Sequence, residues 1–179
     1  MGEADGQIAQ RSCGQIMHLD YDDLVIQPAV AFMYNAMHDL PAVKPDYVSG
    51  QYVPGGYYTQ PTTGELAPLN RQYPAETNRS MQQATCAAQY GPNYQVGPTG
   101  IAQDCDEYPF LATKQNVFQN PAPPGQTWAV YPVARAANQM VGSDLSSYFG
   151  DDRVLAGDAF YVALDNVPPD CCSHYTAQP

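Results

Sequence analysis

The stretch DCDEYPFLAT, residues 104–113, places three carboxylates around a cysteine and continues directly into Tyr-Pro-Phe. A residue that precedes proline is disfavoured in the α region, so Tyr108 and its neighbours are expected to be extended. Successive side chains of an extended segment leave on opposite faces, and Asp106 and Glu107 therefore cannot both point into one site. We expect one carboxylate to carry chemistry and the other to support it, with a solvated surface turn as the alternative.

The chain after this stretch is predicted to continue as strand, helix and strand. Residues 127–133, TWAVYPV, are predicted to form the first strand. Residues 134–150 are predicted to form a helix, because Val141, Leu145 and Phe149 fall on one face and a glycine ends the pattern. Residues 158–167, DAFYVALDNV, are predicted to form an apolar strand.

The chain before the stretch is predicted to hold one strand, two helices and a long loop. Apolar alternation favours a strand over 16–26, and proline followed by an apolar stripe favours a core helix over 28–40. Prolines and glycines favour an ordered loop over 41–68, with a short hairpin around 53–58. A surface helix is predicted over 74–91.

These elements predict an α+β fold: a small antiparallel sheet with flanking helices and long Pro/Gly-rich loops. A length of 179 residues with 44% hydrophobic content fits one domain spanning 1–179. No apolar run approaches the roughly 20 residues that a membrane helix needs, so no membrane partner is predicted. No metal-ligand spacing links the histidines, so a zinc site is not expected from His18, His38 and His174.

Charge and cysteines limit the choice of partner and compartment. Seven Lys and Arg against eighteen Asp and Glu give a net charge of -11, which opposes polyanion binding unless cations cluster or a divalent metal intervenes. Five cysteines predict an oxidising compartment, and the odd number leaves at least one unpaired. The vicinal Cys171 and Cys172 are expected to bond elsewhere. The N-terminal residues do not have the pattern of a secretory signal, which leaves open that an upstream segment has been removed.

Residues 105–113, CDEYPFLAT, closely resemble the CDEYPFA signature of the NucA/NucB-type secreted deoxyribonucleases. Asn138 and Gly142 match the spacing of the asparagine and glycine that follow the signature in that family. Residues 153–162 are similar to its closing segment, and residues 69–86 are more loosely similar to its helix that ends in cysteine. The resemblance covers roughly residues 69–164.

The resemblance implies a nuclease core related to the ββα-metal nucleases, in which two strands and a helix present a base and an asparagine to one divalent ion. By this resemblance Asp106 is the catalytic base with Glu107 beside it, and Asn138 together with Asp106 holds Mg²⁺ or Mn²⁺. Arg135 is expected to contact a substrate phosphate, with an exposed helix-start arginine as the alternative. Lys114 is expected to join it on one basic face, together with Arg79 or Arg153.

The function implied is a secreted or exported metal-dependent endonuclease that cleaves DNA, with RNA as a further substrate. It would be free-standing or the toxin domain of a larger protein, whose partner would be an immunity or inhibitor protein. The alternative is a catalytically impaired binding module on the same scaffold, because Ala137 stands where the family has an acid before the asparagine. We also expect a disulfide from Cys105, most plausibly to Cys86, since it would restrict the residue beside Asp106.

Overall fold

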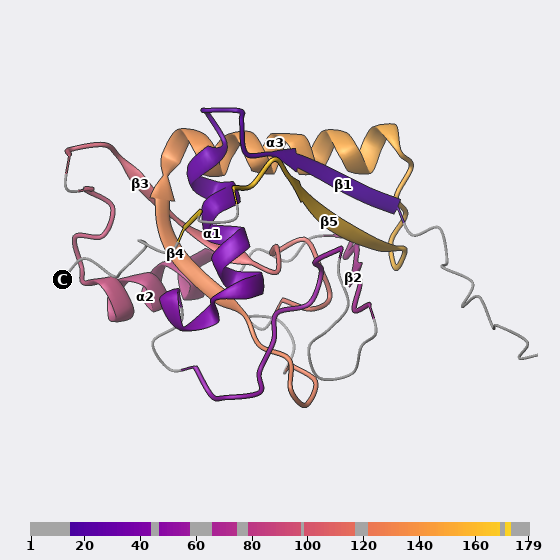
Figure 1. Ribbon diagram of the computed structural model, residues 1–179, viewed down its shortest axis with the longest axis horizontal. Coiled ribbons are helices and arrows are strands. Elements are labelled where there is room, and N and C mark those ends of the chain that lie inside the picture. Colours follow the sequence, from indigo (N-terminus) through magenta and orange to yellow (C-terminus); the bar gives the residue numbers. More distant parts are fainter. Residues whose placement is uncertain are drawn as a thin grey trace, which may run out of the picture.

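The computed structural model describes residues 15–43, 47–57, 66–74, 79–97, 99–116, 122–168 and 171–172. Helices and short strands are interspersed along this part of the chain (Figure 1), which confirms the α+β class. In chain order they are β1 Gln15–Asp20, α1 Gln27–His38, a 3-10 turn Leu40–Ala42, β2 Leu69–Asn70, α2 Arg79–Tyr90, β3 Gln103–Tyr108, β4 Ala129–Ala134, α3 Arg135–Asp151 and β5 Ala159–Asp165.

The described strands form two separate small sheets. Strands β3 and β4 pair antiparallel, from Gln103 opposite Ala134 to Tyr108 opposite Ala129. The other sheet has the order β1-β5-β2, and β2 is antiparallel to β5 as expected. However, β1 and β5 are parallel, so the prediction of an antiparallel sheet is wrong for this pair. A parallel pair needs a long crossover, and here nearly the whole chain lies between its two strands.

The helix α1 lies near the centre of the view in Figure 1, and most of its residues are buried. It begins with a proline in its first turn, as predicted, and packs against β4, α3 and β1. The sequence predicted a single apolar stripe, but the small residues Ala29, Ala31 and Ala36 are also buried. A helix that is apolar all round is enclosed by its neighbours, and α1 therefore forms the core on which the site is built.

The strands β3 and β4 and the helix α3 follow one another in the chain and form one unit. One face of the β3–β4 pair contributes Tyr108, Ala129 and Val133 to the main core with α1 and α3. The opposite face contributes Cys105 and Val130 to a second cluster with α2. Side chains of the β3 strand therefore face either α1 and α3 or α2, depending on their position.

The helix α3 starts immediately where β4 ends. The backbone N–H of Arg135 donates to the carbonyl of Ala102 at 2.9 Å, which ties the first turn of the helix to the start of β3. The predicted apolar face is confirmed, since Val141, Leu145 and Phe149 are buried. This connection fixes the first turns of α3 against the strand that carries the DCDEY sequence.

Two predictions in the first half of the chain need correction. The strand β1 ends at Asp20 instead of continuing to residue 26, because Asp20 accepts the backbone N–H of Asp22 at 3.0 Å and starts a turn. The hairpin expected around 53–58 does not form in the described residues, since Gly56 forms a bridge with Val162 of β5. Gly55 has φ +108°, and a Cβ atom there would overlap the Tyr108 hydroxyl and Leu69, so the loop can approach the core only with glycine.

The predicted disulfide between Cys86 and Cys105 is confirmed and links α2 to β3. The expectation for the vicinal cysteines is wrong, because Cys171 and Cys172 are bonded to each other. The other two described cysteines are already paired, and Cys172 has φ +73°, within a tight turn. Cys13 and His174 lie outside the described residues.

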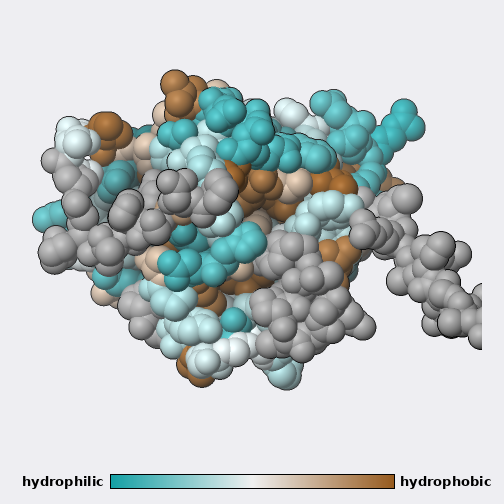
Figure 2. Space-filling view, in the orientation of Figure 1, coloured by the Kyte–Doolittle hydropathy of each residue, from teal (hydrophilic) through white to brown (hydrophobic). Residues whose placement is uncertain are grey.

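The surface is mixed in character on the face shown in Figure 2, where small hydrophobic groups are separated by hydrophilic residues. Within the described part of the chain, no helix has both the length and the apolar content to cross a membrane.

Candidate active site

The strand β3 presents its carboxylates on two different faces. Asp104 lies on the α3 side, since its Oδ1 pairs with Nε of Arg135 at 2.9 Å. Glu107 lies on the α2 side, where it accepts a hydrogen bond from Gln82 Nε2. Alternation along the extended strand puts Asp106 on the face of Asp104 and Cys105 on the face of Glu107. The expectation that Asp106 and Glu107 point in opposite directions is therefore confirmed.

Glu107 is held by three groups around its partly buried carboxylate. Gln82 donates to Oε2, the backbone N–H of Leu111 donates to Oε1 at 3.1 Å, and Arg79 lies close enough to act on its charge. Burial and then the neighbouring Asp106 raise the pKa of Glu107 well above its ordinary value, and they outweigh these three contacts, which lower it. A carboxylate with both oxygens engaged connects β3, α2 and the turn after Pro109, which suits a structural role.

Asp106 has a different environment, although it is the adjacent residue. Its side chain is only 6% exposed, and its Oδ1 accepts the backbone N–H of Glu107 at 3.0 Å. The pKa of Asp106 is raised to about 7, mainly by burial; the hydrogen bond from the Glu107 N–H lowers it, and the nearby negative charge of Asp104 raises it by a smaller amount. A group whose pKa lies near the working pH is well suited to accept and release a proton.

The first turns of α3 lie beside the Asp104 and Asp106 face of β3. Arg135 is exposed and reaches Asp104, two residues before Asp106 on the same strand face. Asn138 is partly buried and follows Arg135 by one turn, on the same side of the helix. The structure thus brings Arg135 into contact with this carboxylate face and puts Asn138 one turn further along α3.

The remaining predicted cations do not form one patch with Arg135. Arg153 lies beyond the far end of α3, which is about 25 Å long, so the prediction of a shared basic face is wrong for this residue. Arg79 lies beside Glu107 on the α2 side. Lys114 is exposed and lines a separate cavity with Arg71.

Gln82 was not predicted from the sequence; it is a buried residue that donates to both the Cys105 carbonyl, at 2.5 Å, and Glu107. A signal for it was present. Gln82 precedes Cys86 by four residues and therefore shares its helical face, so a disulfide from Cys86 to Cys105 implies that Gln82 faces β3. The pairing of Asp104 with Arg135 was also missed, because it depends on how α3 is joined to the strand pair.

Asp106 and Asn138 carry oxygen donors, the kind of ligand that suits a hard divalent ion. No three His, Cys, Asp or Glu side chains come together as a metal site in the described ranges. Mg²⁺ and ions like it are commonly bound by one or two carboxylates while keeping several waters, and an amide oxygen is a suitable further ligand. A buried carboxylate such as Asp106, whose pKa is raised by burial and by Asp104, would be favoured in its charged form by a nearby cation.

A family profile described as Deoxyribonuclease NucA/NucB matches residues 57–163, which is more than half of the chain. The chain belongs to the NucA/NucB deoxyribonuclease family. The match contains α2, β3, β4 and α3 and therefore every candidate site residue, whereas β1 and α1 precede it. Comparison with curated proteins and with solved structures gave no match. Membership of the NucA/NucB family implies a nuclease with a nucleic-acid substrate.

Proposed function

We propose that this NucA/NucB family member is a divalent-metal-dependent endonuclease that hydrolyses phosphodiester bonds in DNA, with Asp106 as its general base. The observation that carries the proposal is the contrast at β3: Glu107 has both oxygens engaged, while the neighbouring Asp106 is a buried carboxylate with a pKa of about 7. General bases work best when their pKa is close to the operating pH.

In the proposed reaction, Asp106 accepts a proton from a water molecule as the water oxygen attacks phosphorus. The bond from phosphorus to the 3′ oxygen breaks, and the leaving oxygen takes up a proton from solvent. Asn138 and Asp106 would hold Mg²⁺ or Mn²⁺, which when bound neutralises charge on the phosphate and on the leaving oxygen. The backbone N–H of Glu107 orients Asp106 by donating to its Oδ1.

Arg135 is proposed to bind a phosphate of the substrate next to the cleaved bond. Its Nε–H is used by Asp104, but a guanidinium has five N–H donors in a planar fork, and others can reach a phosphate. Asp104 would then act as a positioning residue that holds the exposed Arg135 side chain at the start of α3.

A catalytically impaired binding module is the second candidate, and one observation favours it. Ala137 is 1% exposed and packs in the core, at the position where the resemblance predicts an acid before Asn138. Loss of a group that orients or completes a metal site typically costs about 10- to 100-fold in affinity or activity. In this case the chain would bind nucleic acid or a protein without cutting.

One assay separates the two candidates. Supercoiled plasmid, single-stranded DNA and RNA are incubated with the protein at low salt in Mg²⁺, Mn²⁺ or EDTA. We expect nicked and linear plasmid with a divalent ion and intact plasmid with EDTA. Intact substrates under every metal condition would overturn the nuclease proposal and favour the binding module.

Export, action as a toxin domain and pairing with an immunity or inhibitor protein are further parts of this proposal. The disulfide between Cys86 and Cys105 supports an oxidising compartment, because cytosolic thiols are usually kept reduced. Detection of the protein in the medium of the cells that produce it tests export directly.

A further inference from the structure

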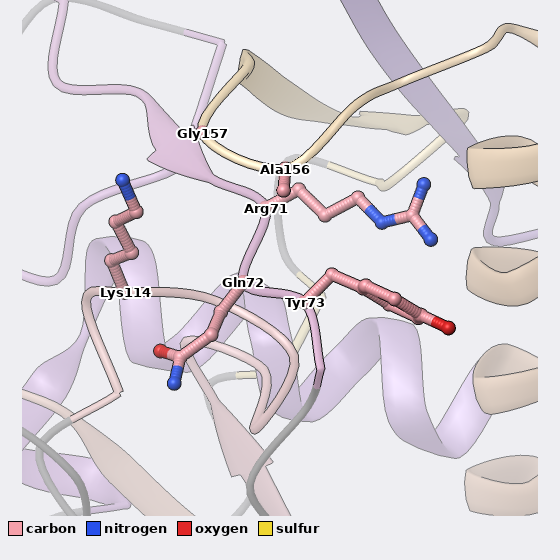
Figure 3. A pocket seen from close by; sticks show the side chains of 6 residues that line it. All are labelled: Arg71, Gln72, Tyr73, Lys114, Ala156 and Gly157. Atoms are coloured by element: carbon pink, nitrogen blue, oxygen red, sulfur yellow. The ribbon is translucent and has the colours of Figure 1, made fainter.

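A cavity of about 590 Å³ lies where three chain segments meet, away from the α3-facing side of β3. The described residues that line it are Arg71, Gln72, Tyr73, Lys114, Ala156 and Gly157 (Figure 3). Backbone hydrogen bonds join the segments, from Lys114 to the Asn70 carbonyl at 2.9 Å and from Gly157 to the Arg71 carbonyl at 2.8 Å. The walls of the cavity are therefore held in place before any ligand arrives.

The cavity gathers positive charge in a chain that is otherwise strongly acidic. Its described lining includes two cations, Arg71 and Lys114, and no carboxylate. The carboxylate of the neighbouring Asp158 accepts the backbone N–H of Leu155 at 2.8 Å. An anion approaching a protein of net charge -11 is attracted to such a local concentration of cations.

Arg71 is fixed in the wall by contacts on two sides. Its Nη1 donates to the carbonyl of Val154, and its guanidinium carbon lies 4.6 Å from the centre of the Phe149 ring and 5.5 Å from that of Tyr73. Gln72 adds an amide whose Oε1 is buried and finds no hydrogen-bond partner among the described atoms. The cavity therefore offers a ligand a cation that is held in place, Arg71, and a hydrogen-bond acceptor, Gln72 Oε1.

Tyr73 supplies an aromatic surface at the edge of the same cavity. Tyr73 is 71% exposed, so its ring is accessible to a ligand. In Figure 3 the side chains of Arg71 and Tyr73 extend side by side. Lys114 lies on the opposite side of residues 71–73, and its side chain points toward Gly157. An exposed aromatic ring combined with cations is the arrangement that binds bases and phosphates of single strands.

We propose that this cavity binds a nucleic-acid strand outside the cleaved bond, with one phosphate at Arg71, another at Lys114 and a base stacked on Tyr73. The proposal rests on the proposed nuclease function for its substrate class, but it concerns binding and not cleavage. Gly157 has φ +92° and lies beside Lys114, since a Cβ atom built on it would be in ordinary van der Waals contact with Nζ at 3.6 Å.

The test measures binding in EDTA, where the proposed reaction does not proceed. Fluorescence anisotropy follows a labelled single-stranded DNA of about 12 nucleotides. We expect Tyr73→Ala to weaken binding by about 5- to 100-fold and Tyr73→Phe to preserve it. We expect Lys114→Ala to weaken binding and to reduce the salt slope by about 0.7, the value for one lost single-strand phosphate contact, while Lys114→Arg retains affinity.

The matched control is Gln83→Glu, which lowers the net charge by the same unit on the exposed side of α2. Equal weakening by Gln83→Glu and Lys114→Ala would overturn the proposal, because net charge alone would then explain the effect. Full competition by inorganic phosphate together with unchanged binding of Tyr73→Ala would overturn the strand assignment in favour of a free-phosphate site. The nuclease proposal is tested separately by the plasmid assay. If that proposal fails, plasmid stays intact in Mg²⁺ and Mn²⁺, and the binding results in EDTA are unchanged.

Discussion

The two faces of β3 differ in how firmly they are held, although they belong to the same six residues. On the α2 side, a disulfide fixes Cys105, and Gln82 and Leu111 engage both oxygens of Glu107. On the α3 side, Asp106 is buried with one backbone hydrogen bond and has a pKa raised to about 7 by burial and by Asp104. The comparison indicates that one face anchors the strand, while the other holds the buried carboxylate that is proposed to act as the base.

The largest effect is expected from removing Asp106, the proposed general base. Asp106→Ala should lower the rate of metal-dependent cleavage by about 10² to 10⁴-fold, since this is the usual cost of losing a general base. Single-turnover cleavage of plasmid in Mn²⁺ measures the rate, and circular dichroism checks that the variant is folded. A variant that cuts at the parent rate would show that the α3 side does not carry the base.

Removing the disulfide on the α2 side of β3 should mainly affect stability. Replacing both Cys86 and Cys105 with serine opens a loop of 19-residue separation, and the chain-entropy model gives a loss of about 3 kcal/mol in the free energy of unfolding. Denaturant titration measures this loss. A double variant that is as stable as the parent under oxidising conditions would contradict the anchoring role of the α2 side.

The pH dependence of the free energy of unfolding, measured without metal, tests whether the pKa of Asp106 is raised in the folded protein. Its pKa is about 7 in the folded chain and 3.8 ordinarily, so the folded state takes up a proton before the unfolded state does as the pH falls. In EDTA, the free energy of unfolding should therefore rise between pH 7 and pH 5.5 by about 2 kcal/mol. Glu107 adds a change of the same sign, because its pKa is also raised.

Asp106→Asn is the matched variant for this titration, because it keeps the size of the side chain and cannot ionise. It should reduce the rise in the free energy of unfolding, leaving the contribution of Glu107, and be more stable than the parent at pH 7.5. An unchanged pH dependence in Asp106→Asn would mean that Asp106 is not the group that titrates.

The smallest effect is expected from Asn138, which is proposed to hold metal from the helix that covers the Asp106 face. Asn138→Ala should raise the Mn²⁺ concentration needed for half-maximal cleavage by about 10- to 100-fold and leave the rate at saturating Mn²⁺ close to that of the parent. A metal titration of the cleavage rate measures both quantities. A reduced rate at every Mn²⁺ concentration with no shift in the midpoint would contradict a role in metal binding.

Local patterns predicted much of the fold and part of the site. The helix from 134 and the strand from 158 follow from short-range periodicity, and the disulfide from Cys105 to Cys86 was expected because it would restrict the residue beside Asp106. The parallel pairing of β1 with β5 could not be predicted, because it joins segments separated by most of the chain. The same limit applies to Asp104 with Arg135 and to the cavity at Lys114, which depend on tertiary packing and not on neighbours in sequence.

The most direct test of the account compares Asp106→Asn with Glu107→Gln, two variants that each replace one carboxylate of the same strand with its amide. Cleavage rate at saturating Mn²⁺ and the free energy of unfolding are measured for both. The account predicts that Asp106→Asn loses about 10² to 10⁴-fold in rate while retaining stability, and that Glu107→Gln keeps a rate much closer to the parent. A larger rate loss in Glu107→Gln than in Asp106→Asn would contradict the assignment of chemistry to the α3-facing side of β3.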